Sequence, residues 1–240
     1  MIWTLVGHGQ LGSALQERFA SCDVPFEHLS AQSWLKGVGL PSHKSKGIVL
    51  AIPDRYIPNA VRALVQYNLQ IPVFHCSGAT PLDVLAPLPH AGVWYPLHSF
   101  KNAEVAWDTR TIFWENPALA STFEDLHKDL SLRSGSWLDS ATRGKYHLAA
   151  VWANNFSNHL VALYQEYLKY EGLEAMDEML LETVKAGLAA EAKSLQTGPA
   201  RRLDSATLAQ HMEMLPAQLQ PIYQALSESI ARLDAQQDEL

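Results

Sequence analysis

The sequence has too few cysteines for a disulfide framework and too few basic residues for a nucleic-acid surface. Its 240 residues include 2 cysteines, Cys22 and Cys76, whose spacing does not match a metal site, and small secreted domains use more of them. Lys and Arg number 18 against 25 for Asp and Glu, a net charge of −7. Because no basic stretch offsets this balance, we expect no nucleic-acid partner. We also expect no metal site.

Long apolar runs are absent as well. No run reaches the ~20 residues that a membrane helix requires, so we expect no membrane partner. The given sequence starts with a strand-like segment at residues 2–6 and lacks the basic region and the cleavage site of a signal peptide. We therefore expect a cytoplasmic location. Hydrophobic residues make up 48% and charged residues 18%, which is the balance of a folded globular chain.

The chain up to about residue 140 alternates short apolar segments with segments of helical periodicity. Strands are expected at residues 2–6, 25–29, 47–52, 71–75, 93–97, 111–114 and 136–138. Helices are expected at residues 11–19, 60–67 and 118–130. Strands that alternate with helices form parallel sheets covered on both faces. We predict an α/β fold in which residues 1–141 form a Rossmann domain with a doubly wound parallel sheet.

The pattern changes after about residue 141, where no further convincing strand is found. Long segments of helical periodicity follow, with glycine and proline turns between them. The helices are expected at residues 145–170, 174–195, 205–215 and 216–234. We predict an all-helical C-terminal domain over residues 142–240.

A glycine pattern follows the first expected strand and precedes the first expected helix. It reads Gly7, His8, Gly9, Gln10, Leu11 and Gly12, and fits G-x-G-x-x-G. In a dinucleotide site Gly7 would permit the tight turn, Gly9 would let the backbone approach a pyrophosphate, and Gly12 would let the helix pack closely on the strand. The alternative is a plain strand-to-helix turn that binds nothing. The strand before and the helix after favour dinucleotide binding.

An acid that would hold the ribose hydroxyls of NAD is missing from the end of the second expected strand. Ser30 and Ser33 stand there instead, and Glu27 could serve only if the strand ends early. The absence favours NADP over NAD, although no arginine stands nearby to bind the extra phosphate. We expect NADP as cofactor and keep NAD as an alternative.

Two later strand ends are expected to line the same crevice, because ligands of open parallel sheets bind outside the carboxyl ends of the strands. One end supplies Ile52 and Pro53, and the other supplies the backbone and hydroxyl of Ser77. Cys76 has no activating neighbour and is interpreted as a small buried residue. His75 fits a core position equally well.

The expected helix over residues 145–170 has one apolar face and one neutral polar face. The apolar face carries Leu148, Trp152, Phe156, Leu160, Leu163 and Tyr167. His147, Asn154 and Asn158 fall on the opposite face. Asparagine is a poor helix former, so we expect the side-chain amides of these asparagines to have a function. Asn154 and Asn158 could orient a substrate carbonyl or the nicotinamide amide, with His147 as proton donor. The alternative is a hydrogen-bond network between helices.

Two further candidates lie later in the chain. Lys185 follows Glu182 by three residues, the spacing of a surface ion pair. Arg202 lies in a turn-rich segment before Asp204, which is well suited to cap the following helix. Arg202 could clamp a substrate carboxylate or phosphate, or it could pair with Asp204.

These motifs together resemble the Rossmann-like proteins with a C-terminal domain of unknown function 2520. The resemblance rests on residues 7–12, 50–54, 73–79, 95–100, 146–151 with 154–156, and 196–204 with His211. It is strongest in two pieces, Asn155–His159 and Glu182–Lys185. The resemblance covers nearly the whole chain.

The resemblance implies an NADP-dependent oxidoreductase of the 6-phosphogluconate dehydrogenase type, in which the helical C-terminal domain forms part of the substrate cleft and a homodimer. Pyrroline-5-carboxylate reductase and ketopantoate reductase share this architecture. β-Hydroxyacid dehydrogenases of this type carry a catalytic lysine four residues before an asparagine, where this chain has Asn154 or Ala150. His147, Lys185, His98 or the substrate itself would then supply the proton.

The leading hypothesis is an oxidoreductase that moves a hydride between NADP(H) and a small polar carbonyl or imine. The first alternative is a non-catalytic dinucleotide-binding or sensing module, which would need Gly7, Gly9 and Gly12 but not the side chains of His147 and Asn154. The second alternative is an oligomeric scaffold with a vestigial cleft, which nicotinamide nucleotides would not stabilise.

Overall fold

A computed structural model describes residues 1–36, 44–101 and 105–235. The chain divides into two compact units, Met1–Ser157 and Asn158–Leu240. The sequence analysis expects the boundary between the Rossmann domain and the helical domain at residue 141, and that boundary stays a prediction.

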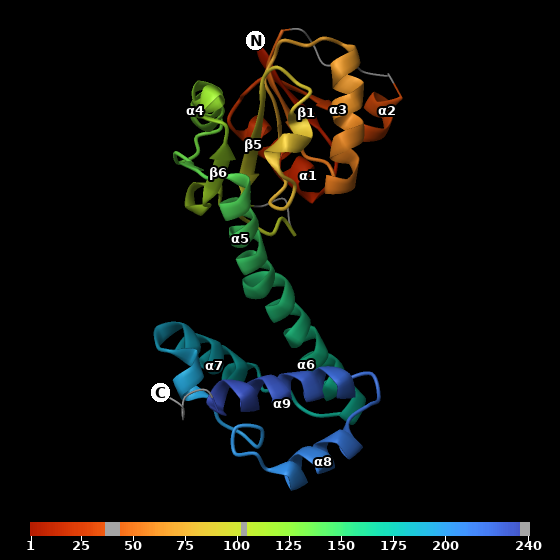
Figure 1. Ribbon diagram of the computed structural model, residues 1–240, viewed down its shortest axis with the longest axis vertical. Coiled ribbons are helices and arrows are strands. Elements are labelled where there is room, and N and C mark those ends of the chain that lie inside the picture. Colours follow the sequence, from red (N-terminus) through yellow and green to blue (C-terminus); the bar gives the residue numbers. More distant parts are fainter. Residues whose placement is uncertain (37–43, 102–104, 236–240) are drawn as a thin grey trace. The chain divides into compact units, whose positions relative to one another are not determined.

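A seven-stranded sheet forms the centre of the first unit (Figure 1). Its strands are β1 (Ile2–Val6), β2 (Phe26–Leu29), β3 (Ser45–Leu50), β4 (Val73–His75), β5 (Ala91–Pro96), β6 (Ile112–Glu115) and β7 (Ser136–Trp137). They lie in the order β2-β1-β3-β4-β5-β6-β7. Because the chain moves from β1 to β2 on one side and then to β3 on the other, the crevice at the carboxyl end of β1 is the topological switch point.

The predicted parallel Rossmann sheet is confirmed, with one departure. Neighbouring strands from β2 to β5 are parallel, whereas β6 runs antiparallel to β5 and β7 runs parallel to β6. Parallel strands usually need a crossover helix between them. In the connection from β5 to β6, the described residues form only the short 3-10 turn η3 (Trp107–Thr109).

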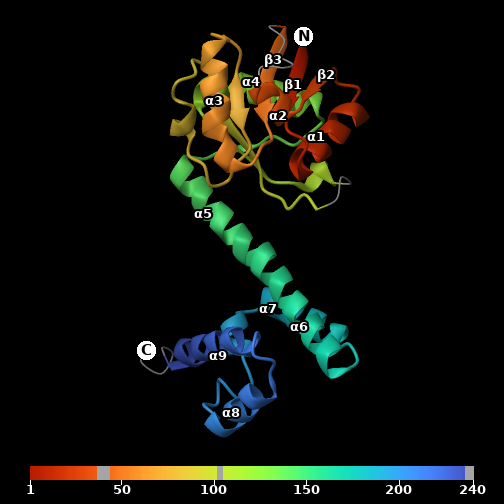
Figure 2. The same cartoon turned by 90° about the vertical axis from the view of Figure 1, so that its right-hand side faces the viewer.

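Helices cover both faces of this sheet (Figures 1 and 2). The helices α1 (Gln10–Ser21) and α4 (Ala120–Asp129) pack with Leu5, Phe74 and Trp94 on one face. The helices α2 (Ala31–Leu35) and α3 (Ile57–Gln66) pack with Val6 and Ile48 on the other. Alternate strand residues point to opposite faces, which gives the two cores. Three short 3-10 turns complete the connections: η1 (Asp54–Tyr56), η2 (Leu82–Leu85) and η4 (Pro117–Leu119).

The last elements of the first unit are α5 (Ser140–Ala150) and a π-helical turn, η5 (Val151–Phe156). Asp139 caps α5 through a hydrogen bond from the Thr142 backbone N–H, 2.6 Å long. The π turn interrupts what the sequence presents as one uniform α-helix.

The second unit consists of helices in its described part. They are α6 (Ser157–Glu171), which begins at the boundary, α7 (Asp177–Ala189), the 3-10 turn η6 (Ala192–Leu195), α8 (Ser205–Met214) and α9 (Gln220–Ala235). Figure 2 shows α8 and α9. Asp204 caps α8 by accepting the Thr207 backbone N–H at 3.1 Å, as predicted. Among the described helices, none is both long and apolar enough to cross a membrane.

Candidate functional site

The glycine turn after β1 has the geometry of a dinucleotide cradle. Gly7 has φ +114°, and a Cβ there would lie 2.2 Å from the Ala51 carbonyl oxygen. A Cβ on Gly12 would lie 2.0 Å from the Gly7 carbonyl oxygen. A Cβ on Gly9 would meet no atom within 4 Å. The fold itself therefore needs the first and third glycines, whereas the second leaves open space at the start of α1.

The start of α1 faces this open space without a side-chain cap. Gly9 is the N-cap residue, and no side chain of the described residues accepts from the first turn. Intrahelical bonding begins with Ser13 N–H to the Gly9 carbonyl, at 2.8 Å. The earlier N–H groups have no acceptor within the helix and lie at its positive end. Such a terminus is suited to bind a pyrophosphate.

A stacked pair of histidines lies beside the turn. The Nε2 atom of His28 is 2.6 Å from the Gly7 carbonyl oxygen, and its Nδ1 atom is 3.0 Å from the Gln16 side-chain oxygen. The His28 ring stacks on His8 with centroids 3.9 Å apart and planes 5° apart. Burial lowers the pKa of His28, and the neighbouring His8 lowers it further. His28 thus anchors the ring of His8 next to the turn.

A shallow hollow of about 340 Å³ opens at the carboxyl end of β2, lined by His8, Ser30, Ala31 and Gln32. This is where the ribose of a dinucleotide is held in Rossmann domains. Glu27 does not reach it, because β2 continues to Leu29 and Thr4 inside the sheet donates to the Glu27 carboxylate at 2.5 Å. The alternative in which Glu27 binds the ribose is therefore wrong.

A cavity of about 730 Å³ lies beside the glycine turn. It is lined by Gln10, Leu11, Tyr95, Leu97, His98, Ser99, Phe100, Lys101, Tyr146, His147, Ala149, Ala150, Val151, Ala153, Asn154 and Asn155. Five predicted site residues are thus brought together around one space: Gln10, Leu11, His98, His147 and Asn154. Burial lowers the pKa of His98, and Arg110 lowers it further.

A tyrosine that the sequence analysis did not single out forms a pair with His147 in the cavity wall. The Tyr95 hydroxyl lies 3.1 Å from His147 Nδ1. Burial raises the pKa of Tyr95, which is 8% exposed. A Cβ on Gly78 would lie 2.5 Å from His147 Nδ1 and 2.7 Å from Tyr95 Cζ. The only sequence signal was a polar hydroxyl in the strand expected at residues 93–97, within the segment 95–100 on which the family resemblance partly rests.

The loop after β4 is fixed by Arg143 of α5, which is fully buried. Its guanidinium donates to the carbonyls of Ser77, Gly78 and Thr80 at 2.7, 3.0 and 2.9 Å. It also pairs with Glu115 of β6 at 2.9 Å. The sequence analysis missed both residues, because a charged pair in the interior leaves no periodic signal.

The side chain of Ser77 is engaged inside this loop. Its hydroxyl donates to Asp54 at 2.7 Å and accepts from the N–H groups of Ala79 and Thr80 at 3.1 and 2.9 Å. Ser77 is also 8% exposed. The hydroxyl therefore shapes the loop instead of being presented to the cleft as expected, and any contact of Ser77 with a cofactor stays a prediction.

The neighbouring strand-end residues are mostly core residues. His75 is fully buried, and its Nδ1 accepts the Ser77 N–H at 3.1 Å. Burial and then the Arg143 charge lower the pKa of His75 to about 4. Cys76 is buried, and burial raises the pKa of its thiol, as the interpretation of an inert residue requires. Ile52 is buried under the glycine turn, whereas Pro53 is exposed beside it.

The π turn explains why both Asn154 and Asn155 line the cavity. An ideal α-helix would place Asn155 between the two faces, but a π turn holds more residues and rotates the following positions. Asn154 Nδ2 lies 3.5 Å from Asn155 Oδ1. Single π turns are often found at functional sites.

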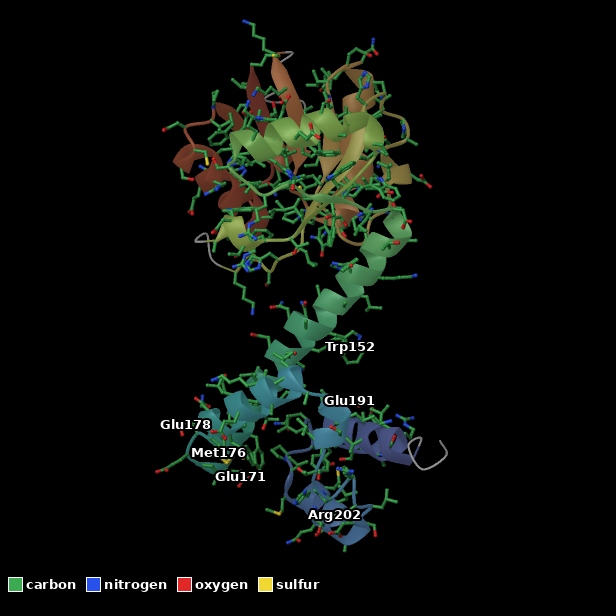
Figure 3. All side chains as sticks on the ribbon, turned by 90° about the vertical axis from the view of Figure 1, so that its left-hand side faces the viewer. Trp152, Glu171, Met176, Glu178, Glu191 and Arg202 are labelled. Atoms are coloured by element: carbon green, nitrogen blue, oxygen red, sulfur yellow. The ribbon has the colours of Figure 1, made fainter. Side chains whose placement is uncertain are left out.

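Three other predicted site residues belong to the second unit: Asn158 on α6, Lys185 on α7 and Arg202 in the loop before α8. All three are exposed, and Figure 3 labels Arg202. The Thr207 backbone N–H lowers the pKa of Asp204, and the charge of Arg202 adds to this effect. This supports the alternative that Arg202 interacts with Asp204. The functional roles of all three residues stay predictions.

Comparison with known proteins supports a shared architecture. A protein from Bacteroides fragilis described as a "putative NADP oxidoreductase" is 26% identical, with a TM-score of 0.80 over 95% of this chain and 97% of that chain. A reductive aminase from Aspergillus terreus, in complex with NADPH4, cyclohexanone and allyl amine, is 15% identical with a TM-score of 0.65, over 96% and 93%. Pyrroline carboxylate reductase from Plasmodium falciparum, with NADP bound, is 14% identical with a TM-score of 0.50, over 98% and 100%.

None of the curated proteins compared with the chain matches it significantly. Residues 115–230 match the family described as "Domain of unknown function (DUF2520)". The match begins in β6 and extends into α9. The chain therefore has a Rossmann fold, and its residues 115–230 are similar to the DUF2520 family.

Proposed function

We propose that this protein is an NADP-dependent oxidoreductase that transfers a hydride to or from a small polar carbonyl or imine. The observation that carries the proposal is the juxtaposition of a glycine cradle, open at Gly9, and a 730 Å³ cavity that contains Tyr95 and His147. The similar solved structures described with NADPH4 or NADP, and with ketone and amine ligands, support the same class of reaction.

The cofactor is proposed to lie across the carboxyl ends of β1, β2 and β3. The pyrophosphate would lie against the N-terminus of α1 at Gly9, Gln10 and Leu11. The adenosine ribose would occupy the hollow lined by His8 and Ser30. Among the described residues that line this hollow, His8 is the one that can carry positive charge, which suits the additional phosphate of NADP.

The nicotinamide end of the cofactor would lie in the 730 Å³ cavity, near the strand-end positions of Ile52, Pro53 and Ser77. The nicotinamide would supply or accept the hydride there. His147 and Asn154 would orient the substrate and its proton, with His98 at the rim of the same cavity.

The second unit is proposed to complete the substrate cleft. Asn158, Lys185 and Arg202 would contribute from residues 142–240, whereas residues 1–141 would bind the cofactor. We place the protein in the cytoplasm as a homodimer.

Gly9 permits a sharp test of cofactor binding. Gly9→Ala should fold normally, because φ is −75° and the new Cβ meets open space, but its methyl group would occupy the pyrophosphate position. A ligand at 100 times its Kd stabilises by about 2.7 kcal/mol. Thermal-shift titrations with NADPH, NADP, NADH and NAD should show a clear shift with NADPH in the wild type and at least about a tenfold weaker Kd in Gly9→Ala, which is ~1.4 kcal/mol.

Gly144→Ala is the matched control, since a Cβ at that position also meets nothing within 4 Å. It should bind NADPH as the wild type does. His8→Ala should weaken the binding of NADPH more than the binding of NADH.

Absence of a shift with any of the four nucleotides would contradict the proposed function. Binding without turnover of carbonyls or imines would favour a non-catalytic sensing module.

A further inference from the structure

We propose that the Tyr95 hydroxyl donates the proton that completes carbonyl reduction, and that His147 restores this proton. The inference rests on the proposed function and goes further by assigning the acid. It starts from the hydrogen bond of 3.1 Å that joins the Tyr95 oxygen to His147 Nδ1 in the wall of the 730 Å³ cavity.

The pair combines one buried and one accessible member. Tyr95 lies on β5 and is 8% exposed, yet it contributes to the lining of the cavity. His147 is partly exposed on α5 and lines the same cavity. A proton can therefore enter at the imidazole and leave from the phenol into the cavity, along a single hydrogen bond.

Burial keeps the Tyr95 phenol in the protonated form that a proton donor requires. Desolvation raises the pKa of Tyr95 above its usual value of 10; Asp54 raises it further, while Arg143 lowers it. The hydroxyl thus stays protonated at neutral pH. A phenolate formed during reaction would be stabilised by the N–H of His147 Nδ1.

The proton balance is simple. As a hydride adds to the carbonyl carbon, the electron pair of the C=O π bond moves to oxygen; bound NADPH would supply this hydride. The Tyr95 O–H bond breaks as the alcohol O–H bond forms. His147 then passes its Nδ1 proton to the phenolate while its Nε2 takes a proton from water, which leaves the imidazole as the Nε2-protonated tautomer. Proton exchange with solvent returns the imidazole to the Nδ1-protonated tautomer before the next turnover. The net reaction consumes one hydride and one solvent proton.

Gly78 and Arg143 hold the pair in place. The loop at Gly78 passes so close to both rings that any side chain would displace them. Arg143 fixes this loop through the carbonyls of Ser77 and Gly78. These two residues are positioning residues, because they act through Tyr95 and His147.

Tyr95→Phe separates proton transfer from hydride transfer when two substrates are compared. Reduction of cyclohexanone needs a proton at oxygen. Reduction of the N-methyl-1-pyrrolinium cation needs only the hydride, because its nitrogen is quaternary. General acid catalysis contributes about 10²- to 10⁴-fold. With NADPH, the kcat of the variant for the ketone should fall at least about 100-fold. Its kcat for the iminium ion should stay within about threefold of the wild type, which corresponds to a change of less than about 1 kcal/mol in activation free energy.

The matched control is Tyr223→Phe. It removes a similar phenol-to-imidazole hydrogen bond, 2.6 Å from the Tyr223 oxygen to His211 Nδ1, in the second unit. It should leave the ratio of ketone to iminium turnover unchanged. The Kd of NADPH, measured by fluorescence titration, should be the same in Tyr95→Phe, Tyr223→Phe and the wild type. His147→Gln should lower ketone turnover and alter its pH profile, while the iminium rate persists.

The other outcomes are distinct. Retention of ketone turnover in Tyr95→Phe would overturn the assignment and leave His147 or His98 as direct donor, with the proposed function intact. Equal loss of both rates would show that Tyr95 is structural and would also overturn it. A wild type that binds NADPH but reduces neither compound would count against the proposed function, and the inference would fall with it.

Discussion

At the scale of single residues, the first unit keeps two histidines neutral in its interior. His127 on α4 lies between two N–H donors: the Trp94 indole donates to Nε2 at 2.8 Å, and the Gly135 backbone approaches Nδ1 at 3.2 Å. If both nitrogens of the His127 ring were protonated, each of their N–H groups would face one of these two donors. Burial lowers the pKa of His127 to about 4, as it does for His75. Charging either ring in the folded state is therefore unfavourable.

These histidines predict loss of stability in mild acid. Because the folded pKa is lowered from 6.5 to about 4, the unfolded chain binds more protons between these values. The stabilisation is complete above pH 6.5 and decreases as the pH falls toward 4, by about 1.4 kcal/mol per unit for each histidine. Urea unfolding at pH 7.5, 6 and 5 measures this slope.

His127→Gln should reduce the slope, since the amide does not titrate but can still accept from Trp94. An unchanged slope in this variant would contradict a neutral His127. His90, which is exposed, provides the control: His90→Gln should leave the slope as it is.

At the scale of elements, most strands and long helices follow from local periodicity, whereas the connections between them do not. The short helix α2 was not predicted, because five residues contain too little periodicity. Its Trp34 is nevertheless fully buried against the α3 side of the sheet. The ion pair of Glu115 and Arg143 joins β6, the loop after β4 and α5 into one assembly around the cavity.

Breaking that ion pair should destabilise the first unit strongly. Arg143→Met would leave the Glu115 carboxylate buried without its cation and three carbonyls without their donor. Removing one partner of a buried pair costs about 3–5 kcal/mol. Chemical denaturation measures the loss.

The double variant Glu115→Leu with Arg143→Met should recover part of the loss, since no charge stays buried. The recovery should be partial, because the Ser140 hydroxyl, 2.9 Å from both Glu115 oxygens, loses its acceptor in that variant. A loss below about 1 kcal/mol for Arg143→Met would show that the pair is solvated and not structural.

At the scale of the whole molecule, apolar surface left exposed on helices supports the proposed homodimer. Trp152 on η5 is 65% exposed and stands off its helix in Figure 3. In the described part of the second unit, Leu168, Ala200 and Leu219 are the buried residues, while Leu181 and Leu188 on α7 are 56% and 84% exposed. Monomeric proteins rarely expose large contiguous apolar surfaces, so helices with such exposed apolar side chains are candidates for an interface.

We expect the protein to be a dimer in solution through these helices. Leu181→Glu with Leu188→Glu places two charges on one face of α7, seven residues apart, and should shift the sedimentation mass toward the monomer. Desolvating a charge at an interface is costly. Val65→Glu on α3, where the side chain is 44% exposed, is the control and should stay dimeric. A wild type that sediments as a monomer would contradict the dimer.

The sequence by itself determined the Rossmann class, the helical second part, the glycine cradle and the cap at Asp204, because each depends on neighbours along the chain. Tertiary structure alone decided that Tyr95 meets His147, that Arg143 holds the loop at Gly78, and that β6 turns antiparallel. These features join residues far apart in the chain, and local periodicity contains no record of such contacts. The π turn lies between the two cases. Its residues are local, yet an ideal α-helical period would place Asn155 between the two faces of the helix, whereas in the π turn Asn155 lines the cavity.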